Sequence, residues 1–571
     1  MQKFIIILLI VLATFIVSGC TETQDDALTI HAVQVDQETI SVEYFIDDLD
    51  LSSIQFIVFY SDGSRGRENM TVELLESGEA DKLNEPGTHS LRFNYQGHRS
   101  QFEITLLEAG SRIIDFYYLN DLHGALLQDG NQMGMANIGN LLNDAREARP
   151  ESTVILAGGD MLQGGFISNA SYGEITVELM DLVGFDAAVI GNHEFDWGLE
   201  MVTRYYTDMD EAVYRAQHPF LGANVVYKGT TSMPEGIDPY TVLDKGNLRI
   251  GVIGVIGYGL ESSISRLMVE DYEFLDPVPI IGDYAEYLRQ EEAVDLVVVV
   301  AHGSSNFLNG RVANLTADAR VDILFNGHSH RVETETYGDM LSMQSGGYGS
   351  HLGHIRVTVS DGVITDYSMR NLTASDDTRL RRADSDVETF LEYALEDLSH
   401  FFETLFVAER EITREELAQW MASLMLEVAG AEYAFQNMGG TRHSISAGES
   451  ISLSTLLNIF PFDNQVVSAY VSGEALGSFI EHNVTITRLP HTPIDPDALY
   501  FMATTDFLFF REGNNQEDNA TVELVAQNMQ DLIIDELLLQ AEVYDTFDTN
   551  NPLLLPNGIS ESSDTQDEIH D

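Results

Sequence analysis

The segment Ala187-Ala-Val-Ile-Gly-Asn-His-Glu-Phe-Asp196 is a short apolar run that leads directly into side chains able to bind a metal. Four other apolar runs, at residues 113–120, 153–159, 296–301 and 322–327, end in the same way. Segments of helical character, such as residues 135–148 and 173–183, lie between the runs, and this alternation predicts an α/β domain. Ligand crevices in open α/β sheets lie at the carboxyl ends of the strands. We therefore expect the five run ends to meet in one site.

The first and last run ends predict one metal site. Asp121 and His123 are two residues apart, so at the end of a strand their side chains point the same way. His330, two residues after His328, returns to the same ion. A lone Asp-x-His is usually a surface turn, but five such run ends in one chain are improbable by accident.

The three central runs and His328 predict a second metal site beside the first. Its ligands would be Asn192, His302 and His328. A carboxylate at Asp160 can bridge the two ions and offset their repulsion. Mixed imidazole, amide and carboxylate ligands suit Zn, Mn, Fe or Co better than Mg or Ca. The chain is therefore expected to bind two divalent transition metals.

The opening segment also supplies residues for acid–base chemistry. His193 can stabilise or protonate a departing oxygen, with Asp196 orienting its other ring nitrogen. Glu194, between them, is expected to form a salt bridge or cap a turn rather than take part in catalysis. Two adjacent metal ions can bridge a hydroxide and clamp a phosphoryl group during in-line displacement. The pattern predicts metal-assisted hydrolysis.

The composition is strongly acidic. Asp and Glu number 92 against 29 Lys and Arg, which gives a formal net charge of −63 over 571 residues. Such a surface repels polyanions, so we expect no nucleic-acid polymer as a partner. The length predicts two to four domains.

Residues 1–20 have the form of a bacterial lipoprotein signal peptide. Lys3 precedes an apolar run over residues 4–17, and Ser18-Gly-Cys20 follows. The run is short for a bilayer span, and Cys20 is the only cysteine of the chain. We expect an extracytoplasmic protein that is lipidated at Cys20 and anchored to the cell membrane.

The remaining chain divides into five regions. Residues 28–107 alternate as short strands and predict an immunoglobulin-like β-sandwich, a spacer or a unit that contacts the cell wall. Residues 111–370 hold the metal ligands, and residues 371–410 are expected to form a helical connector. Residues 411–550 predict a second α/β or α+β domain, and residues 551–571 an acidic tail.

The metal motifs resemble those of the bacterial 5′-nucleotidase/UDP-sugar hydrolase family of calcineurin-like metallophosphoesterases. The matching segments are Asn120-Asp-Leu-His-Gly124, Gly158-Gly-Asp160, Gly191-Asn-His-Glu-Phe-Asp196, Ala301-His302 and Asn326-Gly-His-Ser-His330. This resemblance implies a four-layer sandwich followed by a C-terminal substrate-binding domain. It also implies the same seven ligands and the same catalytic pair, acting on nucleoside 5′-monophosphates through attack of a metal-bound hydroxide on phosphorus.

The resemblance continues, less completely, into the second domain. The segment Asn437-Met-Gly-Gly-Thr-Arg442 is similar to the family's substrate loop, which implies contacts from Asn437, Gly439 and Arg442. Arg442 can grip a phosphate through two parallel hydrogen bonds.

Three further substrate contacts are implied by the resemblance. Phe462 and Phe507 match aromatic residues that stack on the nucleobase, and Arg414 matches a phosphate ligand. The family's Gly-Gly-Asp segment after the second aromatic is replaced here by Arg511-Glu-Gly513, so the carboxylate that would bind the ribose is missing.

Two other functions remain open. The same chemistry could act on 2′,3′-cyclic nucleotides, nucleotide sugars or another small phosphate ester. The chain could instead be a surface-binding protein with a vestigial catalytic domain, although a complete set of metal ligands argues against decay of the site.

Overall fold

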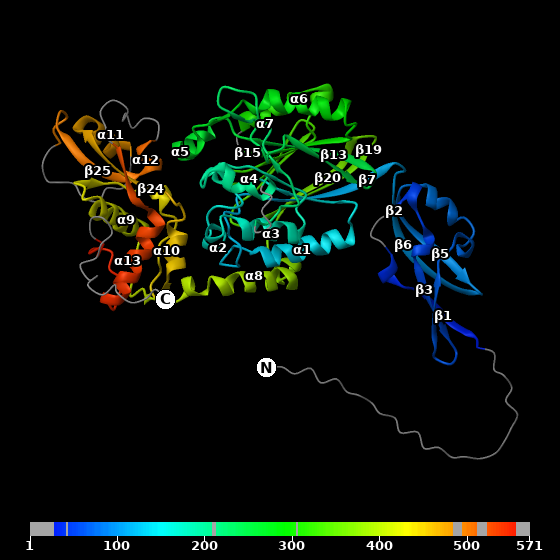
Figure 1. Ribbon diagram of the computed structural model, residues 1–571. Coiled ribbons are helices and arrows are strands. Elements are labelled where there is room, and N and C mark those ends of the chain that lie inside the picture. Colours follow the sequence, from blue (N-terminus) through cyan, green and yellow to red (C-terminus); the bar gives the residue numbers. More distant parts are fainter. Residues whose placement is uncertain are drawn as a thin grey trace, which may run out of the picture. The chain divides into compact units, whose positions relative to one another are not determined.

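The computed structural model describes residues 28–40, 44–207, 213–303, 306–482, 494–510 and 522–554 (Figure 1). Two compact units divide the chain between Ser111 and Arg112. The signal segment with Cys20, the segment 511–513 and most of the acidic tail lie outside the described residues. Within the described part of the chain, no helix is both long and apolar enough to cross a bilayer.

The first unit contains two three-stranded sheets. One has the order β1 (Ile30–Val35), β3 (Gln55–Tyr60), β4 (Arg65–Asn69), and the other the order β2 (Tyr44–Phe45), β6 (His98–Leu107), β5 (Gly87–Tyr95). Alternate residues of β3, β5 and β6 are buried in a common core that includes Phe56, Phe93 and Phe102. This alternation is the pattern of sheets that are covered on one face.

Two six-stranded sheets form the centre of the second unit. The first has the order β10 (Phe220–Leu221), β9 (Ala187–Val189), β8 (Thr153–Ala157), β7 (Ser111–Leu119), β19 (Leu352–Ser360), β20 (Val363–Leu372). The second has the order β12 (Tyr240–Lys245), β13 (Leu248–Ile256), β15 (Leu296–His302), β16 (Ile323–Asn326), β18 (Met340–Ser345), β17 (Val332–Tyr337). All seven residues of β15 are buried, as expected of a parallel strand covered on both faces.

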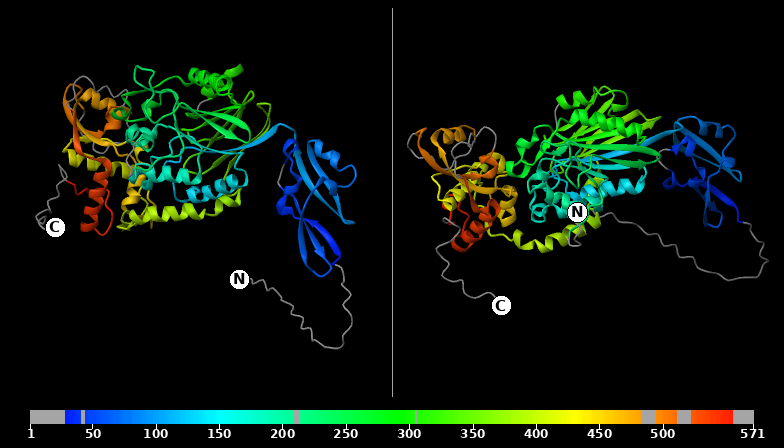
Figure 2. Two further views of the ribbon diagram at one scale, coloured as in Figure 1. Left: turned by 45° about the vertical axis from the view of Figure 1, so that its right-hand side comes forward. Right: turned by 45° about the horizontal axis from the view of Figure 1, so that its top comes forward.

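The two sheets and their helices make four layers (Figures 1 and 2). Side chains from both sheets, among them Phe116, Leu156, Val298 and Phe325, share one core between them. Helices α1 (Met135–Ala148), α3 (Glu174–Val183) and α8 (Ser385–Asp397) bury apolar side chains in a cluster with the first sheet. Helices α6 (Pro277–Gln290) and α7 (Asn306–Val312) do the same with the second sheet.

The C-terminal part of the second unit has a sheet of its own. Its order is β22 (Tyr433–Ala434), β25 (Leu499–Thr505), β24 (Gln465–Ser472), β26 (Val522–Asn528). The helices are α9 (Arg414–Ala429), α10 (Leu453–Ile459), α11 (Gly473–His482), α12 (Asp506–Phe509) and α13 (Met529–Val543). A capping box at Thr413 and Glu416 fixes the start of α9 by satisfying backbone donors. The predicted fold class, a four-layer α/β sandwich followed by a second α/β domain, is confirmed.

The C-terminal part packs directly against the loop that follows β8. Phe166, at the start of α2 (Phe166–Ala170), belongs to the apolar core around α9, α10 and α13. Its backbone N–H donates to Asn458 Oδ1 at 2.7 Å. The Pro461 carbonyl accepts hydrogen bonds from Gln163 Nε2 and Asn169 Nδ2, both at 2.8 Å. These contacts place the residue after Pro461, Phe462, beside the metal motifs.

Candidate active site

The five predicted run ends meet at one edge of the two sheets. β7, β8 and β9 of the first sheet, and β15 and β16 of the second, coincide with the predicted runs. Helices α1 and α3 confirm the predicted helices between them. β7, β8 and β9 run parallel to one another, and so do β15 and β16. Their carboxyl ends deliver all seven predicted ligands to the same place.

One cluster joins the two outermost motifs. Asp121, His123 and His330 each place a ligand atom within 4.8 Å of the others. The Nε2 atoms of His123 and His330 lie 3.1 Å apart, and His330 Nε2 is 3.4 Å from Asp121 Oδ1. Two imidazole nitrogens and a carboxylate oxygen thus face a common point, which is the arrangement of a metal site.

A second cluster consists of Asp160, His302 and His328, again with ligand atoms within 4.8 Å of one another. Asn192 Oδ1 lies 3.2 Å from His302 Nε2 and 2.9 Å from His328 Nδ1, so its amide oxygen belongs to the same group. Among the four side chains, three are almost fully buried. The donor set of two imidazoles, one amide oxygen and one carboxylate fits a divalent transition metal.

Asp160 joins the two clusters through a single oxygen. Its Oδ2 atom is 3.1 Å from His302 Nε2 and 4.0 Å from His123 Nε2. Its Oδ1 atom accepts a hydrogen bond from the backbone N–H of His193 at 2.9 Å. One oxygen is therefore placed between the clusters, and the other is held by the segment that carries the predicted catalytic pair.

Backbone contacts aim the ligating rings. His302 Nδ1 is 2.8 Å from the Gly158 carbonyl, and His123 Nδ1 is 3.1 Å from the Gln163 carbonyl. Each contact turns the opposite ring nitrogen, Nε2, toward the clusters, as is usual for imidazole ligands of metals.

Five of the seven ligands lie in the left-handed region of backbone space. The φ angles are 51° at Asp121, 49° at His123, 52° at Asp160, 74° at His328 and 55° at His330. Each such residue costs roughly 1–3 kcal/mol, and such strain gathers at functional sites. The surrounding hydrogen bonds therefore hold these ligands in conformations that an unconstrained chain would avoid.

The charges of the clusters also favour a cation. Burial lowers the pKa of His123 to about 3, so its imidazole is neutral and able to ligate. Burial opposes a charge on His302 as well, but the Asp160 carboxylate raises the pKa of His302 to about 10. The negative field at Asp160 is therefore strong enough to hold positive charge in a buried place.

His193 and Asp196 form the predicted pair. His193 Nδ1 lies 2.6 Å from Asp196 Oδ2. Burial disfavours the charged ring, but Asp196 and Asp160 outweigh it and raise the pKa of His193 to about 9. The remaining ring nitrogen, Nε2, is free to hold a proton near Asp160, with which His193 shares a third cluster of candidate ligands.

Glu194 has the turn-capping role that its position indicated. It is 2% exposed, and its two carboxylate oxygens accept four backbone hydrogen bonds. The donors are the N–H groups of Gly191, Asp160, Met161 and Leu162, at 2.7–3.2 Å. The side chain thereby ties the β8 and β9 loops together beneath the two clusters.

The predicted substrate residues of the C-terminal domain divide between two places. The Phe462 ring stacks on the His193 ring, with centroids 5.6 Å apart and planes at 30°, and the Arg442 guanidinium lies 4.9 Å from the Phe462 centroid. Arg442 has no ion pair among the described residues. Phe507, in α12, is partly buried against the core of β24 and β25.

Arg414 contacts the substrate loop. Its guanidinium donates to the carbonyls of Met438 at 2.6 Å and Thr441 at 2.8 Å, and so braces the loop that carries Asn437, Gly439 and Arg442. Its predicted contact with phosphate stays a prediction, as do the assignments of Asn437 and Gly439.

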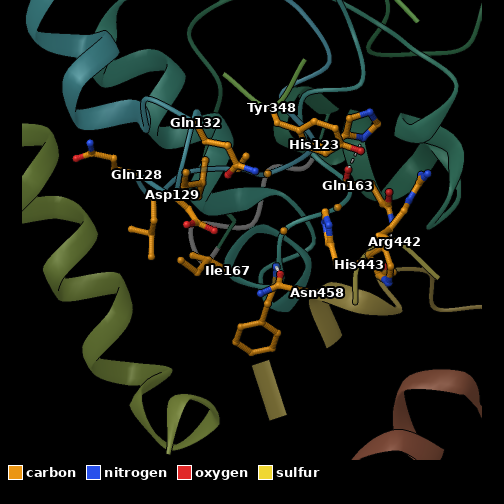
Figure 3. A pocket seen from close by; sticks show the side chains of 18 of the residues that line it. His123, Gln128, Asp129, Gln132, Gln163, Ile167, Tyr348, Arg442, His443 and Asn458 are labelled. Carbon is orange, nitrogen blue, oxygen red and sulfur yellow. Dashed lines mark hydrogen bonds between the residues drawn. The ribbon is translucent and has the colours of Figure 1, made fainter. Parts of the chain in front are cut away.

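Two residues near the clusters were not singled out from the sequence. The Tyr348 ring lies 5.1 Å from the His123 ring and 5.3 Å from the His330 ring, and Gln163 links His123 to Pro461. Tyr348 lies in the glycine-rich segment Gln344-Ser-Gly-Gly-Tyr-Gly349, and Gln163 lies three residues after Asp160. Figure 3 shows both beside His123.

Two family models match the chain. The model of the calcineurin-like phosphoesterase matches residues 114–332, and that of the 5′-nucleotidase C-terminal domain matches residues 399–489. UshA of Yersinia enterocolitica is 24% identical over 475 residues, which are 69% of this chain and 84% of the relative. A 5′-nucleotidase of Vibrio cholerae is 25% identical over 439 residues, which are 67% and 76%. Endonuclease YhcR of Bacillus subtilis is 25% identical over 449 residues, but the chain spans only 36% of its length.

Solved structures agree on the fold. The 5′-nucleotidase precursor from Thermus thermophilus has a TM-score of 0.62 at 19% identity, covering 79% of this chain and 99% of that one. A putative 5′-nucleotidase from Staphylococcus aureus has a TM-score of 0.58 at 17% identity, covering 75% and 97%. With its metal-ligand clusters and both domains in order, the chain is a metal-dependent phosphoesterase that belongs to the 5′-nucleotidase family.

Proposed function

We propose that this protein hydrolyses nucleoside 5′-monophosphates outside the cytoplasm, with two divalent transition metal ions (Zn, Mn, Fe or Co) bound at the clusters. One observation carries the proposal: a single carboxylate oxygen, Asp160 Oδ2, serves both clusters, at 3.1 Å from His302 Nε2 and 4.0 Å from His123 Nε2. Relatives named 5′-nucleotidase support the choice of substrate.

The bound ions would supply Lewis acidity and lower the pKa of water toward neutrality. Asp121, His123 and His330 would hold one ion, and Asn192, His302 and His328 the other, with Asp160 shared. The protein contributes position: the left-handed backbone and the capped loops fix these side chains before substrate arrives.

Residues outside the clusters would handle the organic part of the substrate and the proton. Arg442, which has no ion pair among the described residues, can bind a non-bridging phosphate oxygen. Phe462 offers an aromatic face to the base. His193 holds a proton at Nε2, oriented by Asp196 through Nδ1, and can deliver it to the departing 5′-oxygen.

Removal of the Phe462 ring tests the assignment of the base. We expect Phe462→Ala in the metal-loaded protein lacking residues 1–20 to lower kcat/KM for AMP by about 5–150-fold, the equivalent of a lost base–aromatic stack of about 1–3 kcal/mol. Hydrolysis of ribose 5-phosphate, which has the same kind of leaving group but no aromatic ring to stack on Phe462, is the matched control and should change little.

Other outcomes of this assay decide against the proposal. Equal losses on both substrates would mean that Phe462 acts only by packing on His193. Turnover of UDP-glucose or 2′,3′-cyclic AMP well above that of AMP would show that one of those esters, and not a nucleoside 5′-monophosphate, is the preferred substrate. No turnover of any ester with Mn²⁺ or Zn²⁺, at low and high salt, would leave only the surface-binding alternative.

We also infer that the protein is anchored to the cell membrane through a lipid on Cys20, with residues 28–107 as a spacer or a unit that contacts the cell wall. The support is the Val17-Ser-Gly-Cys20 segment after the apolar run. Cys20→Ser should move the protein from the detergent phase to the aqueous phase in a phase-partition experiment. A variant that stays in the detergent phase would contradict lipidation at this residue.

A further inference from the structure

Tyr348 contacts all three ligands of the first metal cluster. Its ring centroid lies 5.1 Å from that of His123, with the planes at 31°, and 5.3 Å from that of His330, with the planes at 80°. Its backbone N–H donates to the Asp121 carbonyl at 2.7 Å. Ring pairs at these separations attract one another. The tyrosine ring therefore restricts the rotation of both imidazoles.

His330 depends on this packing more than the other imidazole ligands do. The Nδ1 atoms of His123 and His302 lie 3.1 and 2.8 Å from backbone carbonyl oxygens. His330 contacts His123 and Asp121 through Nε2, and within the described ranges its Nδ1 has no hydrogen-bond partner. Metal-ligating histidines are usually oriented by a hydrogen bond at the ring nitrogen that does not bind the ion. Because His330 lacks such a bond from the described residues, ring packing is what orients it.

The backbone at Tyr348 adopts a conformation that a bulky residue rarely takes. Its φ angle is 55°, in the left-handed region that glycine enters freely. Glycine occupies the positions around it, Gly346, Gly347 and Gly349, whereas position 348 keeps a large side chain. Residues in such conformations gather at functional sites. The aromatic side chain therefore points to a function that outweighs the strain.

Neighbouring contacts hold the Tyr348 ring against the cluster. Asn120 Nδ2, at the end of β7, donates to the Gly346 carbonyl at 2.8 Å. A Cβ atom at Gly347 would lie 3.0 Å from the His330 ring, so the chain passes directly beside that ligand. The segment that carries the ring is thus fixed at both sides, and the ring cannot leave the imidazoles without moving the backbone.

The two clusters differ in their access to solvent. A pocket of about 310 Å³ is lined by His123 and Tyr348 of the first cluster region and by no ligand of the second cluster (Figure 3). Asp160, Asn192 and His302 of the second cluster are each at most 1% exposed. An ion in the first cluster would therefore lie next to the pocket, with the tyrosine ring at the boundary.

We propose that Tyr348 is a positioning residue for the first metal ion: its ring holds the His123 and His330 imidazoles in their ligating orientation and so sets the affinity of that ion. The inference rests on the two-metal part of the proposed function and adds a residue to it. The ring acts through the ligands and not on the substrate. Its hydroxyl group is not required, so phenylalanine should serve equally well, whereas glycine should not, although its backbone suits the position better.

Binding of Co²⁺ to the metal-free full chain, measured by equilibrium dialysis, tests the inference. Tyr348→Gly removes the ring and relieves the strained backbone, so the variant should fold. We expect it to bind the second ion normally and to raise the dissociation constant of the first ion by about 10–100-fold, the usual effect of losing a residue that orients a ligand. His330→Ala, which removes a ligand of the first ion, should weaken the same binding step. Tyr348→Phe should bind both ions as the wild type does.

Phe462→Ala is the matched control, because the Phe462 ring stacks on His193, an imidazole that is not needed to complete either cluster. This variant should bind both ions with unchanged affinity. Turnover separates positioning from contact with the substrate. Activity that Tyr348→Gly loses at low Co²⁺ should return at saturating Co²⁺, whereas a lost substrate contact would not be restored by metal.

Several results would overturn the inference: unchanged affinity for both ions in Tyr348→Gly, equal weakening of both ions, an equal loss in Tyr348→Phe, or a loss of turnover that persists at saturating Co²⁺. A melting temperature of metal-free Tyr348→Gly far below that of the wild type would also overturn it, because the residue would then support the fold and not the ligands.

The same experiment keeps the inference apart from the proposed function. A wild type that binds two ions but hydrolyses no ester would contradict the nucleotidase proposal and leave the role of Tyr348 to the binding data alone. A wild type that binds a single ion would contradict the two-metal proposal. Weaker binding of that ion by Tyr348→Gly would then still support the inference, and unchanged binding would overturn it.

Discussion

Asp160→Asn should leave the protein folded but without the proposed pair of metal ions, and should reduce turnover by more than the ~10²–10⁴-fold that one acid–base group supplies. The asparagine keeps the shape of the side chain, and its amide oxygen can still accept from the His193 N–H. What disappears is the negative charge between the clusters. Two divalent ions about 4 Å apart repel by about 16 kcal/mol at an effective dielectric constant of about 20, so they cannot coexist without it.

Metal analysis of the purified variant, together with activity at saturating Mn²⁺, measures this effect. Asp115→Asn is the matched control, because Asp115 is a buried carboxyl of β7 that pairs with Arg356 away from the clusters. That variant should keep its metal and its activity per folded molecule. Full metal content in Asp160→Asn would show that the carboxylate does not bridge the ions.

His193→Ala should separate metal binding from catalysis. The ring is hydrogen-bonded to Asp196 and lies under Phe462, and it is not needed to complete either cluster. We expect the variant to bind metals normally and to lose about 10²–10⁴-fold in kcat for AMP, the usual contribution of a positioned acid.

The leaving group distinguishes a proton donor from a residue that only supports the fold. The 5′-oxygen of a nucleoside is a poor leaving group and needs a proton, whereas p-nitrophenolate leaves without one. His193→Ala should therefore lose far less on p-nitrophenyl phosphate than on AMP, and Asp196→Asn should show the same pattern in weaker form. Identical losses on both esters would assign His193 to positioning rather than to proton transfer.

The sequence was sufficient to single out the side chains that form the two clusters, because their signal is local. An apolar run that ends in Asp, Asn or His indicates both a strand and the residue type that supplies the donor atom. β8 and β15 begin at the first residue of their predicted runs. The capping role of Glu194 could also be predicted from the sequence, because the residues beside it were already assigned to metal binding or acid–base chemistry. The four layers followed from the resemblance, and the structure confirms them.

Other features depend on contacts between distant segments. The sequence around β9 and β15 does not indicate that these strands belong to different sheets, because strand pairing is determined by the packing of the whole core. The stacking of Phe462 on His193 requires the Pro461 carbonyl to dock on Gln163 and Asn169, almost 300 residues earlier. The hydrogen bonds of Arg414 to the substrate loop likewise appear only once α9 and that loop are packed together.

The division of ligands between the two sheets ties catalysis to the thermodynamics of the fold. Each cluster takes residues from both sheets. His330 follows a strand of the second sheet and joins Asp121 and His123 of the first, and His302 of the second sheet likewise joins Asp160 of the first. Free energy gained when ions bind is therefore also free energy of association between the two sheets. The bound cations would link the two sheets of the sandwich. The metal-loaded form of the domain, which is the form able to catalyse the reaction, would therefore also be its most stable form.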